Sequence, residues 1–224
     1  MNKENIYVFD AYGTILDVDS ACRNLSKIIG SDWKNLTSIW RQKQLEYSWL
    51  RNAMNSYVSF WKITENALDY AMESLNLKDK ALKEKLLNLY FKIESYEEVK
   101  GFLEEIRKEN IKICILSNGS SDMLLSGLKN SKLDKLIDKV LSVELCKKFK
   151  PSKEVYQLVI NEFKESKEKY LFFSSNCWDI HGASSFGFKT VWVNRFDKVN
   201  DYLPGKPNII IKNLNEYKKN YKSK

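Results

Sequence analysis

The chain has 224 residues, 43% of them hydrophobic, and a formal net charge of +8 at pH 7. A chain of this length and apolar content can bury one large core, which excludes an intrinsically disordered protein. Its basic residues are spread along the whole chain and do not alternate with aromatic residues as in a single-stranded nucleic-acid groove. We therefore expect no nucleic-acid partner and a solvated basic surface that attracts small anions.

The composition also bears on the cellular compartment. No signal peptide is visible, and no apolar run approaches the roughly 20 residues that a membrane helix requires. The four cysteines are far apart and form no C-x-x-C pair, which favours free thiols over disulfides or a zinc site. They are Cys22, Cys114, Cys146 and Cys177. We expect a cytoplasmic protein without membrane association.

The first predicted element is a buried strand at residues 6–9, which are all β-branched or aromatic. The strand ends at Asp10, and Gly13 then allows the chain to turn back, because a residue without Cβ readily adopts a positive φ. A carboxylate at the carboxyl end of a central strand points into the crevice where open α/β sheets bind ligands. With Thr14 close behind it, Asp10 is a candidate nucleophile. A turn or N-cap aspartate is the alternative.

Residues 20–91 show successive helical patterns and no convincing strand. Four of the six tryptophans fall in this stretch, namely Trp33, Trp40, Trp49 and Trp61. We expect an all-helical insertion that forms a small bundle, a cap over the strand that carries Asp10. The cap would comprise residues 16–95, and the catalytic core would comprise residues 1–15 and 96–224.

Residues 39–50 form the clearest helix of this insertion. One apolar face carries Trp40, Tyr47 and Leu50, and a neighbouring face carries Arg41, Leu45 and Trp49. An arginine in line with a leucine and a tryptophan is unusual on a solvated surface. Its stem could cover the bundle while its charge reaches water. Alternatively, its guanidinium faces the cleft and binds an anion.

From residue 96 onward, helices and strands alternate. We expect helices at residues 97–110, from 122, and at 152–163, and strands at residues 111–116, 139–143, 170–173, 190–193 and 208–211. Strands that alternate with helices imply right-handed βαβ units and a parallel sheet. The fold class predicted from these patterns is therefore α/β, with an inserted helical cap.

Polar residues stand at or just after the ends of four predicted parallel strands. They are Asp10 with Thr14, Ser117 with Asn118, Lys150, and Ser174 with Asn176 and Asp179. The carboxyl ends of parallel strands meet at one crevice of the sheet, so these residues should lie together although tens of residues separate them in sequence.

The residue types of this set suit nucleophilic catalysis. Lys150 can keep Asp10 ionised through its opposite charge. Thr14 and Ser174 can orient the same carboxylate by hydrogen bonds. Ser117 and the backbone N–H groups of the following helix N-terminus can bind a substrate anion.

Asp179 and His181 each allow two readings. Asp179 can act as a general base on water, or it can cap the helix that follows. His181 is the only histidine, but the chain has no G-x-S-x-G motif for serine–histidine catalysis, so we expect His181 on the surface at a helix start. P-loop and G-x-G-x-x-G motifs are also absent from the sequence.

Residues 10–14 (DAYGT), 117–119 (SNG), Lys150-Pro151 and the Asp179 loop together resemble, in order, the four motifs of the haloacid dehalogenase superfamily. Residues 9–14 (FDAYGT), 40–47 (WRQKQLEY) and 174–179 (SSNCWD), followed by FGF at 186–188 and WVNR at 192–195, resemble the L-2-haloacid dehalogenases in particular. The resemblance implies a Rossmann-like core with an inserted all-helical cap and a homodimer. It also implies hydrolysis of (S)-2-haloalkanoic acids, which are small anions, to (R)-2-hydroxyalkanoic acids without a metal or an organic cofactor.

The same resemblance implies residue roles. Asp10 would attack the halogen-bearing carbon and form an aspartyl ester, with inversion at C2. The residues that would support attack and ester hydrolysis are Thr14, Lys150, Ser174, Asn176 and Asp179. Arg41, the remaining catalytic residue, would assist halide departure. The substrate-binding positions would be Ala11, Tyr12, Arg41, Gln42, Leu45, Phe60, Ser117, Asn118 and Trp178. Cys177 receives no role and is expected to be structural.

Tyr12 separates this reaction from that of the superfamily's phosphatases. Their D-x-D motif places a second aspartate at this position, where it protonates an alkoxide leaving group and helps to hold magnesium. A halide needs no proton to leave, and a bulky aromatic side chain can instead shape an apolar pocket. A metal-dependent phosphatase is therefore the weaker alternative. An inactive binding relative is weaker still, because Asp10, Lys150 and Asp179 are all present.

Overall fold

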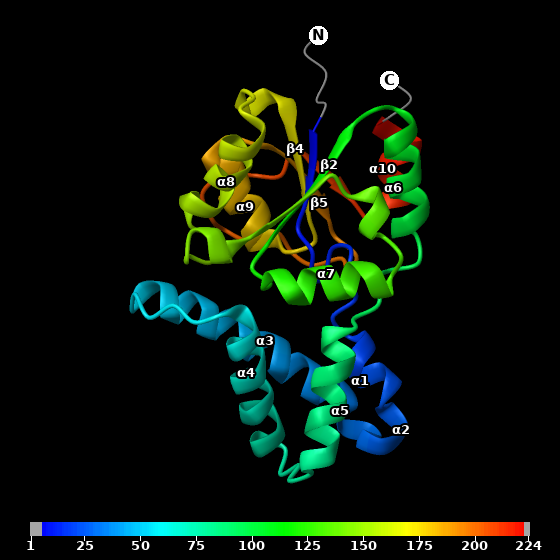
Figure 1. Ribbon diagram of the computed structural model, residues 1–224, viewed down its shortest axis with the longest axis vertical. Coiled ribbons are helices and arrows are strands. Elements are labelled where there is room, and N and C mark those ends of the chain that lie inside the picture. The colour runs from blue at the N-terminus through cyan, green and yellow to red at the C-terminus, as the bar shows by residue number, and fades with distance from the viewer. Residues whose placement is uncertain (1–5, 222–224) are drawn as a thin grey trace.

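A computed structural model describes residues 6–221, and a six-stranded parallel sheet forms its centre (Figure 1). The strands are β1 (Ile6–Phe9), β2 (Lys112–Ser117), β3 (Lys139–Ser142), β4 (Tyr170–Ser174), β5 (Lys189–Val193) and β6 (Ile209–Ile211). Their order across the sheet is β3-β2-β1-β4-β5-β6, and every neighbouring pair is parallel. This confirms the α/β fold with a Rossmann-like parallel sheet.

Strand β1 lies in the middle of the sheet between β2 and β4. Phe9, its last residue, pairs with Ile115 of β2 and Phe173 of β4, and all four residues of β1 are buried. The rings of Phe9 and Phe173 stack with their centroids 4.7 Å apart. A run of buried β-branched and aromatic residues suits a strand that is covered on both faces. The residue after Phe9 therefore enters the crevice at the carboxyl edge of the sheet.

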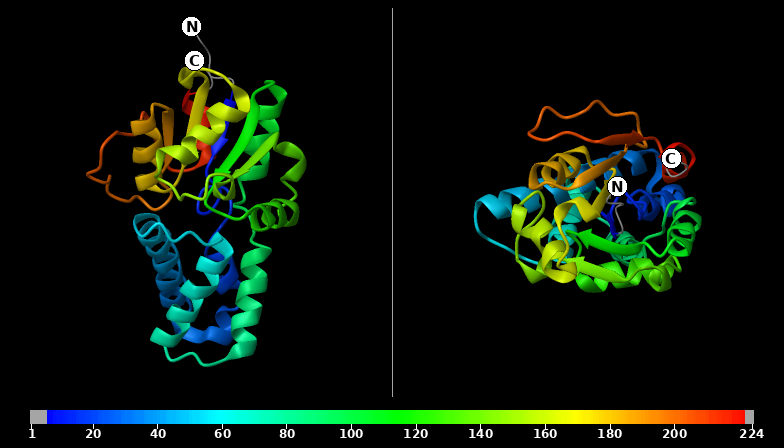
Figure 2. Two further views of the ribbon diagram at one scale, coloured as in Figure 1. Left: turned by 60° about the vertical axis from the view of Figure 1, so that its left-hand side comes forward. Right: turned by 90° about the horizontal axis from the view of Figure 1, so that it is seen from above.

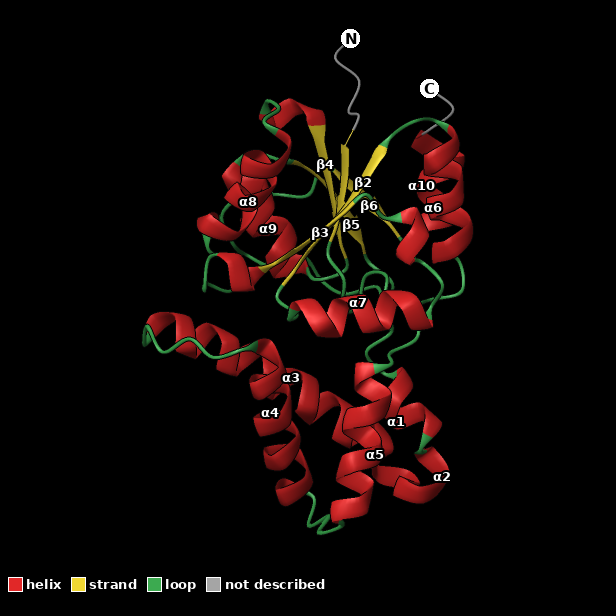
Figure 3. Cartoon of the chain, viewed as in Figure 1, coloured by secondary structure: helices red, strands yellow, loops and turns green. Residues whose placement is uncertain are grey.

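Helices cover both faces of this sheet, as Figure 3 shows. They are α6 (Val99–Lys108), α7 (Ser121–Asn130), α8 (Lys153–Phe163), α9 (Cys177–Phe186) and α10 (Leu214–Tyr221). Helices α8 and α9 pack together on one face, and α6 and α10 pack together on the other. The alternation of strand and helix expected after residue 96 is confirmed, with boundaries that differ by one or two residues.

The chain between β1 and β2 contains helices only, and these pack together beside the carboxyl edge of the sheet (Figures 1 and 2). They are α1 (Ser20–Asn24), α2 (Ser26–Ile29), α3 (Trp33–Ala53), α4 (Phe60–Ser74) and α5 (Lys80–Phe91), with a short 3₁₀ turn at Gly30–Asp32. The indole Nε1 of Trp40 donates to the carbonyl oxygen of Thr64 at 2.9 Å, which ties α3 to α4. The expected helical insertion is therefore present.

One expectation about α3 is wrong. Leu50 was placed on an apolar face with Trp40, but it is 49% exposed. The buried stripe of α3 instead runs through Leu36, Trp40, Gln44 and Ser48 at intervals of four residues. Two of these four side chains are polar, so hydrophobic periodicity alone misjudged which face of the helix is buried.

No helix within residues 6–221 is long and apolar enough to cross a membrane. All four cysteines are free, as their spacing predicted.

Candidate active site

Asp10 is held at the end of β1 by the backbone on both sides. Its N–H donates to the Phe173 carbonyl oxygen at 2.9 Å, which continues the sheet ladder one residue past the strand. Gly13 then adopts φ +88° and donates its N–H to the Leu16 carbonyl oxygen at 2.7 Å. Glycine suits this turn because side chains rarely tolerate that φ. The Asp10 carboxylate is consequently fixed in position and only 5% exposed.

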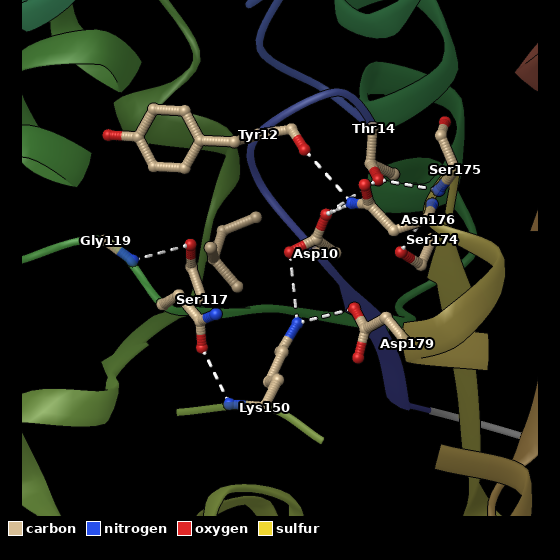
Figure 4. A network of polar contacts seen from close by, with 12 residues as sticks. Asp10, Tyr12, Thr14, Ser117, Gly119, Lys150, Ser174, Ser175, Asn176 and Asp179 are labelled. Carbon is tan, nitrogen blue, oxygen red and sulfur yellow. Dashed lines mark hydrogen bonds and ion pairs between the residues drawn. The ribbon is translucent and has the colours of Figure 1, made fainter. Parts of the chain in front are cut away.

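The two oxygens of Asp10 have different partners (Figure 4). Oδ2 accepts hydrogen bonds from Thr14 Oγ1 at 3.0 Å and from Asn176 Nδ2 at 2.9 Å. Oδ1 accepts one, from Lys150 Nζ at 3.0 Å. The Thr14 hydroxyl itself accepts from the Ser175 N–H at 2.8 Å, so its proton is free to point at Asp10. Oδ1 therefore keeps a lone pair available for chemistry, and Oδ2 does not.

Lys150 lies between two carboxylates. Its ammonium is 2.8 Å from Asp179 Oδ2 in addition to its contact with Asp10, and the side chain is completely buried. Burial alone would lower the pKa of Lys150, but Asp10 and Asp179 outweigh this effect and raise the pKa. The backbone N–H of Lys150 donates to Asn118 Oδ1 at 2.9 Å, which links this loop to the end of β2. Lys150 is thus a cation inside the site at neutral pH.

Asp179 does not cap α9, because the N-cap residue of that helix is Asn176. Its side chain is fully buried, and its Oδ1 accepts a hydrogen bond from the Tyr156 hydroxyl at 2.7 Å. Burial raises the pKa of Asp179 to about 6, against the opposing effect of the Lys150 charge. A carboxylate with a pKa near 6 is ionised at neutral pH and can accept a proton, as a general base must.

Sequence reasoning missed Tyr156. Its position in α8 has the spacing of an ordinary core residue, and its ring is indeed packed against Phe172 and Phe186. The one available signal is Gly182, where an added Cβ would lie 2.5 Å from the Tyr156 hydroxyl. That signal depends on two helices packing together, which the sequence does not display.

Ser174 and Asn176 form one turn after β4. The Asn176 N–H donates to Ser174 Oγ at 3.1 Å, and Asn176 Nδ2 reaches the Tyr12 carbonyl oxygen at 3.2 Å as well as Asp10. Ser174 therefore orients Asp10 through Asn176. The expected contribution of Ser174 to the orientation of Asp10 is thus an indirect one.

Arg41 extends from α3 to the loop after β1. Its Nη2 donates to the Tyr12 carbonyl oxygen at 3.3 Å and approaches Asn176 Oδ1 at 3.5 Å. Its Nη1 donates to Gln44 Oε1 at 2.6 Å. The guanidinium therefore faces the cleft between the helical segment and the sheet, and the alternative of a charge reaching out to water is wrong.

A cavity of about 680 Å³ opens beside Arg41 and Asn176. Three of the predicted substrate-binding residues, Gln42, Leu45 and Trp178, also line it, as does Cys177. Ala11, Tyr12 and Phe60 do not line it and are almost completely buried. The Tyr12 ring stacks on Tyr90 at 5.7 Å and lies 6.1 Å from Phe60, so these rings form an apolar wall under the loop after β1.

Ser117 and Asn118 are buried at the end of β2. Ser117 Oγ accepts a hydrogen bond from the Gly119 N–H at 3.1 Å. A Cβ on Gly119 would lie 2.6 Å from the Tyr12 ring, so only glycine lets the two loops approach this closely. The ends of β1 and β2 are thereby held against each other.

His181 was expected on the surface, and this expectation is wrong. Its side chain is 2% exposed, with Nδ1 3.1 Å from the Pro204 carbonyl oxygen and Nε2 3.3 Å from Asn200 Oδ1. The long loop at residues 194–208, orange in Figure 2, folds back over α9 and covers the histidine. Only this tertiary contact buries it.

Within residues 6–221, no group of three or more His, Cys, Asp or Glu side chains is placed to hold a metal ion. The groups gathered around Asp10 are instead one ammonium, one amide, one hydroxyl and a second carboxylate. This set can support a carboxylate nucleophile and a separate base.

Comparison with known proteins gives a consistent picture. A family model described as haloacid dehalogenase-like hydrolase matches residues 5–187. The (S)-2-haloacid dehalogenase 4A of Burkholderia cepacia is 41% identical over 189 residues, which cover 84% of this chain and 82% of that protein. A solved dehalogenase structure is 37% identical with a TM-score of 0.94, and it covers 96% of both chains. The L-2-haloacid dehalogenase of Xanthobacter autotrophicus, with chloropropionic acid covalently bound, is 30% identical with a TM-score of 0.89 over 97% of this chain and 99% of that one.

Proposed function

Because the chain belongs to the haloacid dehalogenase-like hydrolases, and among them to the (S)-2-haloacid dehalogenase family, we propose that it hydrolyses (S)-2-haloalkanoic acids to (R)-2-hydroxyalkanoic acids. The observation that carries this proposal is the state of the Asp10 carboxylate. It is desolvated and held by three side chains, and its Oδ1 oxygen keeps a lone pair that no hydrogen bond occupies. Covalently bound chloropropionic acid in the related Xanthobacter autotrophicus structure supports a covalent route.

In the first half-reaction, Asp10 Oδ1 attacks C2 of the substrate. A bond forms between Oδ1 and C2, and the carbon–halogen bond breaks with its electron pair leaving on the halide. The attack comes from the face opposite the halide, so the configuration at C2 inverts. Arg41 is a cation at the cleft side of the Asp10 loop and stabilises the departing halide.

In the second half-reaction, water attacks Cγ of the Asp10 ester. Asp179 takes a proton from the water, and the tetrahedral intermediate collapses by breaking the bond between Cγ and the ester oxygen. The hydroxy acid leaves as an alkoxide that takes the proton held by Asp179. The Asp10 carboxyl then releases the second proton of the water, which restores its carboxylate. Oδ2 of Asp10 is the carbonyl oxygen of the ester, and Thr14 and Asn176 donate to it and stabilise its developing negative charge. Lys150 contacts Oδ1, the oxygen that leaves with the hydroxy acid, and stabilises the negative charge on that oxygen. The net reaction consumes one water and releases one halide and one proton.

Substrate recognition divides between charge and apolar contact. We assign the substrate carboxylate to Ser117, Asn118 and the backbone N–H groups after β1 and β2. The alkyl chain lies against apolar side chains, for which Leu45 and Trp178 at the cavity are available. The remaining assigned contacts are those of Ala11, Tyr12, Gln42 and Phe60.

We also assign residues 16–95 to a cap and residues 1–15 and 96–224 to the catalytic core. The helices between β1 and β2 support this division, because they pack on one another and reach the core at the cavity and its neighbouring loops. In the same scheme the protein is a cytoplasmic homodimer.

Two measurements test the proposed function. Halide release should occur with (S)-2-chloropropionate, should be absent or far slower with the (R)-enantiomer, and should yield (R)-lactate. In a single turnover in oxygen-18 water with enzyme in excess, the heavy oxygen should enter the Asp10 carboxylate and not the lactate, as mass spectrometry of the peptide and product would show. Label found first in the lactate would mean that water attacks C2 directly and that Asp10 acts as a base.

A further inference from the structure

We propose that Gln44, a buried residue of α3, positions the Arg41 guanidinium and keeps its charge undiminished for halide departure. This inference rests on the proposed function and adds a residue to it. Gln44 is 1% exposed, and its Oε1 accepts the 2.6 Å hydrogen bond from Arg41 Nη1. An amide buried in a helical bundle needs a partner for each of its polar atoms, and here one partner is the cation of the candidate site.

The orientation of the Gln44 amide follows from its neighbours. Gln44 Nε2 is 2.8 Å from Thr64 Oγ1, and the Thr64 hydroxyl donates its own proton to the Phe60 carbonyl oxygen at 2.8 Å. The Thr64 oxygen can therefore only accept from Gln44, and Arg41 can only donate. Both neighbours require Oε1 to face Arg41 and Nε2 to face Thr64, so the amide cannot turn over without losing both contacts.

The Gln44 amide is anchored in all three long helices of the cap. Thr64 belongs to α4, and its backbone carbonyl accepts from Trp40 of α3. Tyr90 of α5 places its hydroxyl 3.1 Å from Gln44 Nε2, and its ring stacks on Tyr12 beside the Asp10 loop. Gln44 thus connects one end of the guanidinium to the packed helices α3, α4 and α5.

The other end of the guanidinium meets the core. Nη2 contacts the Tyr12 carbonyl oxygen and Asn176, which itself donates to Asp10. With Nη1 fixed by Gln44 and Nη2 fixed by the core, the rigid plane of the guanidinium has one orientation. Preorganised charge of this kind stabilises a transition state without reorganisation during the reaction.

A neutral amide is also a partner that leaves the positive charge of Arg41 uncompensated. A carboxylate at the same distance would neutralise Arg41 and weaken its attraction for a departing halide. The amide accepts the hydrogen bond and leaves the positive charge in place. Gln44 therefore acts on the first half-reaction, where the halide leaves, and not on the second, where the halide is absent.

The test measures the two half-reactions separately. Single-turnover rates of Asp10 ester formation and breakdown are measured by rapid quench and mass spectrometry, with (S)-2-chloropropionate and (S)-2-bromopropionate. The variants are Gln44→Met, which keeps length and volume, and Gln44→Glu, which adds a charge. Gln157→Met, at an exposed glutamine of α8 that bonds only to Asn161 among the contacts described, is the matched control.

Gln44→Met should slow ester formation about ten- to a hundredfold, with a larger loss for chloride than for bromide because the poorer leaving group needs more assistance. Gln44→Glu should slow the same step at least as much. Ester breakdown should stay within about twofold in both variants, and Gln157→Met should match the unsubstituted protein. If the Gln44 variants fail to fold, the same rates are measured in Thr64→Val, which removes the hydroxyl that accepts from Gln44. Ester formation should slow in that variant, and ester breakdown should not.

Equal losses in both half-reactions, or equal losses for both halogens, would overturn the role of Gln44 and leave a packing residue. Unchanged rates in a folded Gln44→Met protein would overturn it too. Failure of the unsubstituted protein to release halide from either substrate is a different result, because it refutes the proposed function itself.

Discussion

At the scale of single residues, the two carboxylates of the site have different surroundings. Asp10 accepts three hydrogen bonds, one of them from the Lys150 ammonium, which hold its carboxylate in place. Asp179 shares the same ammonium but lies deeper, and burial raises its pKa to about 6. One carboxylate is thereby suited to be the nucleophile and the other to be the base, as in other enzymes that assign different tasks to paired acids.

This division predicts the pH dependence of ester hydrolysis. Below about pH 6, Asp179 becomes protonated and cannot accept a proton from water, so ester breakdown should slow as the pH falls. The Tyr156 hydroxyl donates to the ionised form of Asp179 and so lowers its pKa. Tyr156→Phe removes this donor, and the acid limb of the breakdown rate should move to higher pH. The measurement is the single-turnover rate of ester breakdown between pH 5 and pH 9.

Tyr170→Phe is the control for this experiment. The Tyr170 hydroxyl contacts the Glu165 backbone and no residue of the Asp10 network. Its pH profile should coincide with that of the unsubstituted protein. An acid limb that stays in place in Tyr156→Phe would remove Asp179 from the role of base.

A second residue-scale prediction concerns metal dependence. Tyr12 stands where the phosphatases of the superfamily are expected to carry a second aspartate, and hard cations such as magnesium require several oxygen ligands. Dehalogenation should therefore persist in excess EDTA at the rate seen without it. Loss of activity with EDTA and recovery with added magnesium would instead favour the phosphatase assignment.

At the scale of elements, α3 connects the helical segment to two separate loops of the core. Arg41 near its middle contacts the loop after β1, and Asn52 near its end contacts the loop that carries Lys150. The Asn52 side chain donates to the Phe149 carbonyl oxygen at 2.7 Å and accepts from the Phe149 N–H at 2.9 Å. It thus pairs with both backbone groups of the residue before Lys150. A rigid helix of 21 residues holds the two contacts in a fixed relation.

Asn52→Ala should therefore impair both stability and catalysis. Two partly buried backbone groups lose their partner, which should lower the free energy of unfolding by about 1–3 kcal/mol. Ester formation and breakdown should both slow, because Lys150 serves both steps. Urea unfolding and the single-turnover rates measure these effects.

Asn55→Gly is the matched control. Asn55 makes one exposed contact, with Lys148, and glycine tolerates the φ of 52° at this position. That variant should change the free energy of unfolding by no more than about 0.5 kcal/mol. If Asn52→Ala were equally mild, the contact between α3 and the Lys150 loop would be incidental.

At the scale of the whole molecule, the sequence predicted what depends on local pattern. Alternating strands and helices, the all-helical insertion and the four polar loop motifs are all visible as residue periodicity and turn chemistry. The sequence did not predict what depends on packing between distant segments. Gln44 has a polar side chain of the kind that usually faces water, yet it lies in the buried stripe of α3. His181 is buried by a loop that begins 13 residues further along the chain. Polar residues buried by tertiary contacts have no periodicity of their own.

The last prediction concerns assembly. The far end of α3 extends beyond α4 in Figure 1. Leu50 of α3 is 49% exposed, and Met54, the residue that follows the helix, is 70% exposed. Next to them, Trp49 packs edge-on against Trp178 at the cavity. Exposed apolar side chains that gather in one place are typical of an interaction surface. If two chains associate there, the homodimer also covers one rim of the cavity.

Sedimentation equilibrium should then give a mass of twice 26.3 kDa at micromolar concentration. Met54→Glu should shift the protein toward the monomer, because a charge buried in an apolar interface has no partner. Leu125→Glu, at an exposed leucine of α7, should leave the dimer intact. A monomer at every concentration would refute the homodimer, and a dimer that Leu125→Glu disrupts while Met54→Glu does not would place the interface on α7.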